Sequence, residues 1–160
     1  MIKSLLFKYG KVLILLALLP VCAFKYTQTP KMNEQEWLQW SNKCLNECYD
    51  PSGEAKLKSW EFTVTPEHFV RLRKTFQHGM QEYFSLQLHM FNDLDYLGNV
   101  NHGVLWLKAD KDDIIVQTYD DPKGNVDSMA NVLQLPVKNM QPERLDSLRT
   151  AFLALKSGNL

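Results

Sequence analysis

An uncharged aliphatic run near the N-terminus limits what this chain can fold into and where it folds. Residues 1–11 carry three lysines and no carboxylate, and residues 12–24 (VLILLALLPVCAF) follow without a charge. A basic start before a short apolar run is typical of a secretory signal peptide. The run has 13 residues, fewer than the roughly 20 that a membrane-spanning helix needs. We therefore expect residues 1–23 to be a signal peptide and the protein to be periplasmic or secreted.

The end of this segment predicts its processing. Pro20 interrupts the helical part, and Val21-Cys22-Ala23 places small residues before a cleavage point after Ala23. Two alternatives remain open. Leu19-Pro20-Val21-Cys22 is similar to a lipoprotein box with Cys22 as the acylated residue, although Val21 stands where Gly, Ala or Ser is usual. The apolar segment could also stay uncleaved as a membrane anchor.

Charge and cysteine content agree with export and argue against a nucleic-acid partner. Removing the three lysines of the leader leaves 15 basic and 18 acidic residues, so the remaining domain is mildly acidic. That domain keeps two cysteines, Cys44 and Cys48, which an oxidising compartment favours joining as a structural disulfide. A redox pair is the alternative, but it usually has the Cys-x-x-Cys spacing at a helix start. Cys44 and Cys48 are four apart near the end of a predicted helix, where the helix dipole raises a thiol pKa.

Hydrophobic periodicity predicts a single α+β domain over residues 33–160, joined to the leader by a flexible linker over 24–32. We expect an antiparallel meander sheet of four to five strands, packed by about three helices. The predicted helices are 33–48, 66–79 and 142–155, and the predicted strands are 59–64, 83–91, 104–107, 114–119 and 132–137. Asn33 and Glu36 predict a capping box for the first helix, and Pro136 predicts an edge position for the last strand.

The histidines and acids around the predicted 92–103 loop are the one candidate for catalysis. His89 and His102 flank residues 92–101 of this loop, and Asp93 and Asp95 lie within them, so a small acid–base or metal cluster is conceivable. A polar loop with solvated acids is the simpler interpretation. No His-Glu-x-x-His motif, nucleophile motif or phosphate-binding glycine loop occurs, so we expect no metal and no cofactor.

Two further surface features bear on binding. Arg71, Arg73 and Lys74 form a short basic stretch, expected as the solvated face of the second helix. Trp37 and Trp40 lie on the apolar side of the first helix, where we expect them to pack on the core.

The absence of catalytic motifs favours a non-catalytic exported protein that binds a protein partner in the periplasm through loops or a sheet edge. An accessory subunit or an immunity-type inhibitor fits this description. The alternative is a small periplasmic hydrolase that uses His89 or His102 with Asp93 or Asp95. An enzyme requires these groups to converge in a pocket, whereas a binding protein does not.

Overall fold

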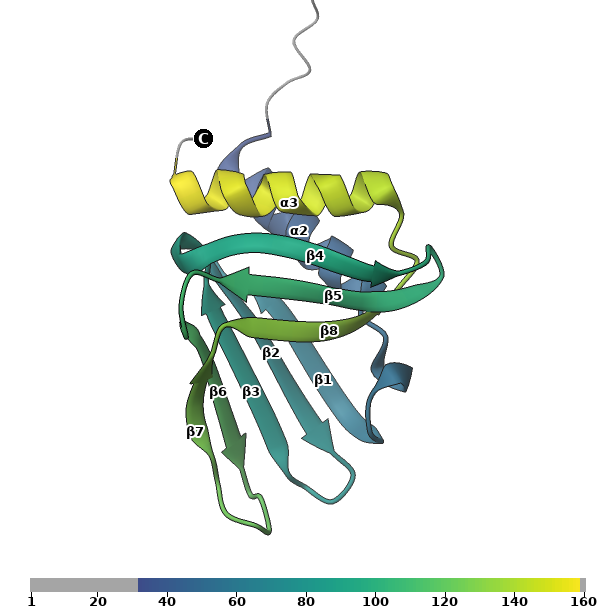
Figure 1. Cartoon of the computed structure of the whole chain (residues 1–160), viewed down its shortest axis with the longest axis vertical. Coiled ribbons are helices and arrows are strands. Elements are labelled where there is room, and N and C mark those ends of the chain that lie inside the picture. Colours follow the sequence, from purple (N-terminus) through teal and green to yellow (C-terminus); the bar gives the residue numbers. More distant parts are fainter. Residues whose placement is uncertain (1–31, 159–160) are drawn as a thin grey trace, which may run out of the picture. The chain divides into compact units, whose positions relative to one another are not determined.

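The computed structural model describes residues 32–158 (Figure 1). The expectations for the signal peptide, its cleavage after Ala23, lipidation of Cys22 and most of the 24–32 linker therefore lie outside the described residues. Two α-helices and eight strands make up the described part, with two short 3-10 turns. The elements are α2 (Glu34–Cys48), η1 (Pro51–Gly53), β1 (Leu57–Val64), β2 (Phe69–Phe76), β3 (Gln81–Gln87), η2 (Leu88–Met90), β4 (Phe91–Gly98), β5 (His102–Ala109), β6 (Ile114–Tyr119), β7 (Asp127–Ala130), β8 (Val132–Lys138) and α3 (Pro142–Ser157).

The strands form two antiparallel sheets rather than the single meander that the sequence predicted. One sheet has five strands in the order β1-β2-β3-β6-β7, and the other has three in the order β4-β5-β8. Figure 1 shows the strands of the smaller sheet crossing those of the larger one at a steep angle. The α+β class and the antiparallel pairing are confirmed, while the number of strands and of helices differs from the prediction.

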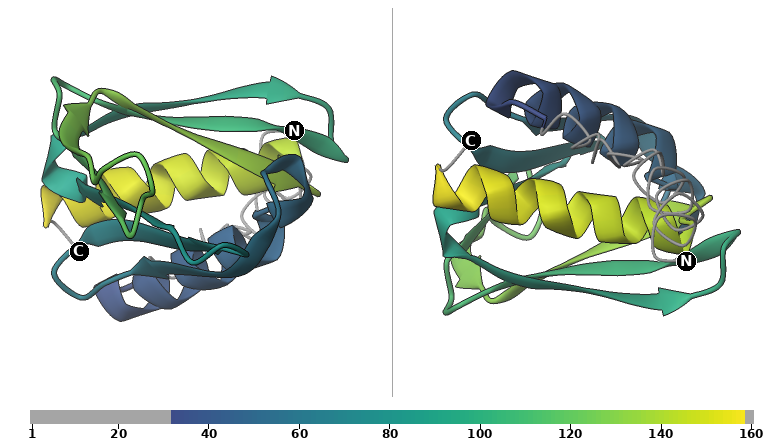
Figure 2. Two further views of the ribbon diagram at one scale, coloured as in Figure 1. Left: turned by 90° about the horizontal axis from the view of Figure 1, so that it is seen from below. Right: turned by 90° about the horizontal axis from the view of Figure 1, so that it is seen from above.

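Both α-helices lie beside the sheets, as Figures 1 and 2 show. The Asn33 side chain accepts a hydrogen bond from the Glu36 amide, and Glu36 accepts one from the Asn33 amide, which confirms the capping box. In the views of Figure 2, α3 lies between α2 and the β4–β5 hairpin. It packs against α2, η2 and β4, whereas α2 packs against β1 as well as α3.

The predicted helix over 66–79 is wrong, because this segment is strand β2. Thr65 and His68 close a tight turn instead of starting a helix: the His68 amide donates to the Thr65 carbonyl, and the His68 backbone has φ 60°. β2 then pairs with β1 on one side and β3 on the other. Its inward side chains are Val70, Leu72, Lys74 and Phe76, so a buried lysine interrupts the apolar alternation that marks a strand.

The predicted loop over 92–103 is also largely wrong, because Phe91–Gly98 is strand β4. A bulge between Phe91 and Asp93 breaks its alternation, so Phe91 and Leu94 both face the core although they are three residues apart. The strand predicted over 83–91 ends earlier, at Gln87, where the short turn η2 carries the chain into the second sheet.

The core lies between the two sheets and under the helices. Large side chains that are fully buried come from both sheets and both helices: Leu45, Leu72, Leu86, Leu94, Leu105, Leu107, Ile114, Leu135 and Phe152. Trp37 and Trp40 are partly buried against this core and meet edge to face, with ring centroids 6.2 Å apart. Pro136 lies on β8, which is an edge strand of the smaller sheet as predicted.

Candidate functional site: an arginine face on the larger sheet

The outer face of the five-stranded sheet is covered by neither helix. Because side chains alternate along a strand, the residues facing away from the core occupy matching positions on neighbouring strands. The registers place Glu61 opposite Arg73, Thr63 opposite Arg71, and Arg73 opposite Tyr83. We call these five residues the arginine face. Its two arginines belong to the basic stretch that was predicted to lie on a helix surface. In strand β2, Lys74 of that stretch points to the opposite side of the sheet and is buried.

Aromatic rings hold both arginines in place. The Arg71 guanidinium carbon lies 4.9 Å from the centroid of the Phe69 ring, and that of Arg73 lies 5.7 Å from the Tyr83 centroid. A guanidinium over an aromatic face gains cation–π attraction and loses side-chain freedom before any ligand arrives.

Neither guanidinium group of the arginine face is held in a close ion pair. Among residues 32–158, the side chains of Arg71 and Arg73 form no salt bridge and no hydrogen bond, although Glu61 stands opposite Arg73 in the register and the Glu67 carboxylate interacts with Arg71 electrostatically. The buried Arg71 Nε also has no hydrogen-bond partner. Since every other described arginine pairs with a carboxylate, the arginine face presents two donor forks that are free to bind an anion.

The arginine face is hollowed rather than deeply pocketed. A hollow of about 170 Å³ is lined by its five residues. A second hollow of about 320 Å³ is lined by Arg73 together with Gln81, Tyr119, Asp120 and Asn125. Arg73 therefore borders both hollows, which extend from β1 towards the β6–β7 turn. The two hollows can receive protruding side chains of a partner protein.

The two predicted cysteines are buried free thiols near the end of α2. Arg144, at the start of α3, donates from Nη1 to Cys48 Sγ over 3.0 Å and from Nη2 to Glu47 over 3.2 Å. A hydrogen bond from Cys44 and this arginine lower the pKa of Cys48 to about 6, while the same thiol–thiol bond and burial raise the pKa of Cys44. The raised thiol pKa expected from the helix end is therefore not found at Cys48, where the hydrogen bond from Cys44 and then Arg144 lower the pKa. The disulfide stays a prediction.

A hollow of about 160 Å³ opens beside the thiol pair and is lined by Trp40, Lys43, Cys44, Glu47 and Arg144. Cys48 itself is fully buried behind it. Sequence reasoning could not find Arg144 as the partner of Cys48, because 96 residues separate the two.

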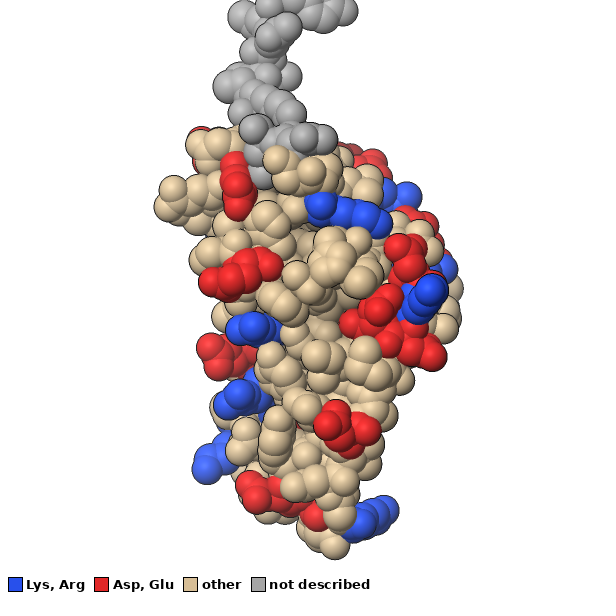
Figure 3. All heavy atoms as spheres, turned by 90° about the vertical axis from the view of Figure 1, so that its left-hand side faces the viewer, with Lys and Arg blue, Asp and Glu red and all other residues tan. Residues whose placement is uncertain are grey.

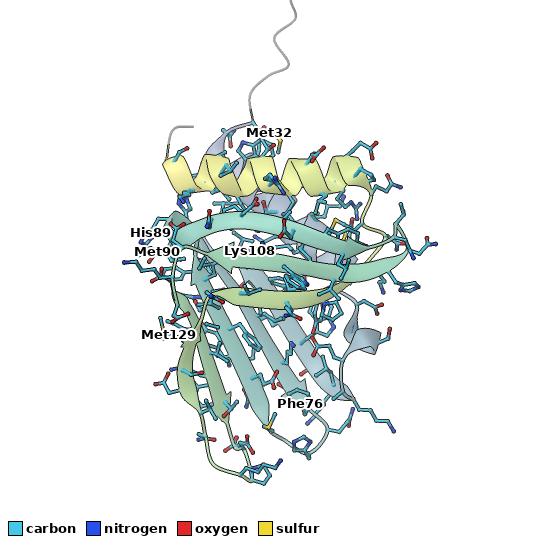
Figure 4. The ribbon with its side chains drawn as sticks, viewed as in Figure 1. Met32, Phe76, His89, Met90, Lys108 and Met129 are labelled. Atoms are coloured by element: carbon cyan, nitrogen blue, oxygen red, sulfur yellow. The ribbon has the colours of Figure 1, made fainter. Side chains whose placement is uncertain are left out.

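The four residues of the proposed acid–base cluster do not converge. His89 lies in η2 at one end of the β4–β5 ladder, as Figure 4 shows, whereas His102 begins β5 at the other end. Asp93 is 3.4 Å from Arg149, and Asp95 bonds to Lys108.

His102 instead lies 3.5 Å from the Asp50 carboxylate, and its side chain is 75% exposed. The structure therefore gives the hydrolase alternative no convergent site. Within residues 32–158, no group of three His, Cys, Asp or Glu side chains is arranged to hold a metal ion.

A buried charge cluster that the sequence did not reveal lies on the inner side of the five-stranded sheet. Lys74 is 4% exposed, and its ammonium lies 2.5 Å from Glu54 and 3.8 Å from Glu82. The Tyr49 hydroxyl donates to the same Glu54 oxygen over 3.1 Å. Burial raises the pKa of Tyr49 and that of Glu82, and Lys74 opposes the rise at Glu82. Hydrogen bonds join Lys74 and Tyr49 to Glu54, and Glu82 forms an ion pair with Lys74, so each group of the cluster has a partner and the cluster offers no open site.

In the described part of the chain, neither helix is long and apolar enough to cross a bilayer. Comparison with known protein families, with curated proteins and with solved structures found no match to this chain. No relative therefore lends its function to this protein.

Proposed function

We propose that this chain is an exported, non-catalytic protein that binds an acidic surface of a partner protein through the arginine face. An accessory subunit or an immunity-type inhibitor of the periplasm is the class of protein that this describes. The observation that carries the proposal is the pair Arg71 and Arg73, each held over an aromatic ring and neither paired with a carboxylate.

The chemistry of the arginine face suits a carboxylate-bearing protein. Arginine binds carboxylates through two parallel hydrogen bonds, which gives direction as well as affinity. Arginine and tyrosine are also the residue types that contribute most to protein interfaces. The hollow lined by Arg71 and Arg73 is about 170 Å³, smaller than the roughly 300–1,000 Å³ of pockets that enclose small ligands, and the hollow on the other side of Arg73, about 320 Å³, is at the lower end of that range. Hollows of this kind suit the side chains of a partner protein better than they suit an enclosed small substrate.

The location of the protein follows from the leader. A basic start, a short apolar run and small residues before Ala23 support export with cleavage. A lipidated Cys22 or a retained apolar segment would instead hold the same domain at a membrane surface. In each case residues 33–160 face a non-cytosolic compartment, where a protein partner would meet the arginine face.

Charge reversal on the arginine face tests the proposal. The exported chain is immobilised, a stoichiometric partner is captured from periplasmic extract of the source organism, and the affinity of the purified partner is then measured. The double variant Arg71→Glu/Arg73→Glu should weaken this affinity by about 100-fold or more, because two arginine–carboxylate contacts become repulsive. Wild-type affinity should also fall as the salt concentration rises.

A matched double variant controls for net charge. Lys43→Glu/Lys111→Glu changes the charge by the same amount at two exposed positions, one on α2 and one in the β5–β6 turn. This variant should bind within about threefold of wild type. If the arginine variant binds the partner as tightly as wild type does, or if both double variants lose the same affinity, the arginine face is not the binding surface.

A further inference from the structure

Side chains of α2 cover the outer edge of β1. The Asn42 amide accepts from the Val64 N–H and donates to the Val64 carbonyl, both over 2.7 Å. One helical turn later, Asn46 donates to the Phe62 carbonyl over 2.9 Å. These bonds occupy the backbone groups that another strand would need, so β1 cannot extend its sheet without displacing α2.

The outer edge of β4 is covered in the same way by α3. Arg149 donates to the Leu94 carbonyl, and Lys156 donates to the Phe91 carbonyl over 2.5 Å. Figure 1 shows α3 running alongside β4. A second sheet edge is thus closed by long cationic side chains from a neighbouring helix.

The outer edge of β8 carries a proline and a backbone contact. Pro136 lacks an N–H, and its carbonyl accepts from the Asp50 amide over 2.9 Å. Tyr49 forms a bridge to Val137 beside it. Proline on an edge strand is a known obstacle to strand addition.

β7 is the remaining edge, and no other described residue bonds to its outer backbone groups. The Thr118 N–H donates to the Val126 carbonyl, and antiparallel pairs alternate between bonded and non-bonded positions. Ser128 and Ala130 therefore bond to β6, which leaves the N–H and C=O of Asp127 and Met129 pointing away from the sheet. Figure 4 shows Met129 at this margin, and its side chain is 52% exposed.

We propose that β7 pairs with β7 of a second copy of this chain, in antiparallel register about a two-fold axis through Ser128. In this register Asp127 of one copy lies opposite Met129 of the other, and their outward backbone groups form hydrogen-bonded pairs. No like charges face each other across the axis. The axis is normal to the sheet, so both copies keep their arginine faces exposed on the same side.

The surroundings of β7 suit self-association. Tyr119, Val126 and Met129 are 43%, 48% and 52% exposed, and all three lie on β6, β7 or the turn between them. Figure 3 looks onto the side where β7 lies and shows acidic and basic side chains interspersed among uncharged areas. The four-residue length of β7 limits the number of new hydrogen bonds, so we expect a reversible dimer rather than a permanent one.

Cysteine cross-linking tests the register. Across the two-fold axis, the two Ser128 positions form a non-bonded pair whose Cα atoms would lie about 4.5 Å apart, within the range of a disulfide. Ser128→Cys should therefore give an oxidised dimer in high yield. Met129→Cys, one residue away, should not, because the two Met129 positions are offset along the strands beyond disulfide reach. The wild-type chain under the same oxidant measures cross-linking through the native cysteines.

Sedimentation measures the association itself. Met129→Pro removes an outward N–H without touching a bond to β6, and it should weaken the dimer at least about tenfold, whereas Met129→Ala should keep it within about threefold. Circular dichroism establishes that each variant is folded. A wild-type chain that stays monomeric at all concentrations would overturn the proposal. So would equal cross-linking at positions 128 and 129, or a Ser128→Cys product joined only to a different protein.

Discussion

Lys74→Met should destabilise the fold strongly, because it removes the cation from a buried cluster that holds two carboxylates. Lys74 is 6% exposed at its side chain, while Glu54 and Glu82 are 16% and 27% exposed. Removing one partner of a buried ion pair costs about 3–5 kcal/mol. Partial access of water to both carboxylates places the expected loss at the lower end, about 3 kcal/mol at neutral pH. The Lys74 ammonium also lies 5.1 Å from the centroid of the Phe84 ring, and this cation–π contact is lost with the charge. Methionine keeps most of the apolar stem of lysine, so little of this loss reflects packing.

The loss should depend on pH in a defined direction. Burial already raises the pKa of Glu82 above its ordinary value of 4.5, and Lys74 opposes that rise. Without Lys74 the pKa of Glu82 should rise further. A raised pKa in the folded state gives stability that is complete below the unfolded value and is lost as the pH rises through the folded value. The difference between Lys74→Met and wild type should therefore be largest near pH 7, shrink as the pH falls through the raised pKa of Glu82, and be much smaller at about pH 4.5.

Urea unfolding at pH 7 and pH 4.5 measures both effects. Lys43→Met is the matched control, because the Lys43 side chain is 75% exposed and its contact with Glu47 is 3.9 Å long. It should change the free energy of unfolding by less than about 0.5 kcal/mol. A loss below about 1 kcal/mol for Lys74→Met, or a loss that is the same at both pH values, would refute the assigned role of the cluster.

Three further predictions follow from the helices and the leader. Asn42→Ala should lower the free energy of unfolding by about 2 kcal/mol, because two edge groups of β1 lose their partner, whereas exposed Gln39→Ala should change it by less than about 0.5 kcal/mol. In the reduced protein, the ultraviolet absorbance of the thiolate should titrate near pH 6 at Cys48 and at higher pH in Arg144→Met. Because that pKa is depressed, the stabilisation it provides is present above the ordinary thiol pKa and should be lost as the pH falls through about 6. The intact mass of the protein isolated from the cells that make it should match a chain beginning at Phe24, and an acyl mass or an intact leader would contradict cleavage after residue 23.

Elements with local signals could be predicted from the sequence. The first helix follows from its capping box, and β6 has the bounds that its alternation predicts. The last helix begins at Pro142, where a proline at the first helical position indicates a start, and Gly158 ends it in a left-handed conformation.

Elements that are shaped by distant contacts could not be predicted. Lys74 hides the strand periodicity of β2, because only the folded chain supplies the carboxylates that permit its burial. The bulge near Asp93 interrupts the alternation of apolar and polar residues in β4, so its sequence does not look like a strand. The division into two sheets depends on β6 pairing with β3 instead of with β5, and no local pattern contains that choice.

The candidate site was missed for the same reason. Arg71 and Arg73 were visible as a basic stretch, but a helical interpretation turned them towards solvent together with Lys74. Only the strand places both arginines on one face with Tyr83 and sends Lys74 to the other side. The one feature of the sequence that could have indicated a strand here is the alternation of arginine and apolar residues at the start of β2.

A photo-cross-linking amino acid placed in the exported chain within living cells tests most directly whether the arginine face binds a protein. At position 83, beside Arg73, it should yield one dominant covalent adduct with another protein. At Gln134, which is exposed on the smaller sheet, it should yield none. An adduct at position 134 alone, or no adduct at position 83 in cells that contain the exported chain, would contradict the proposed function.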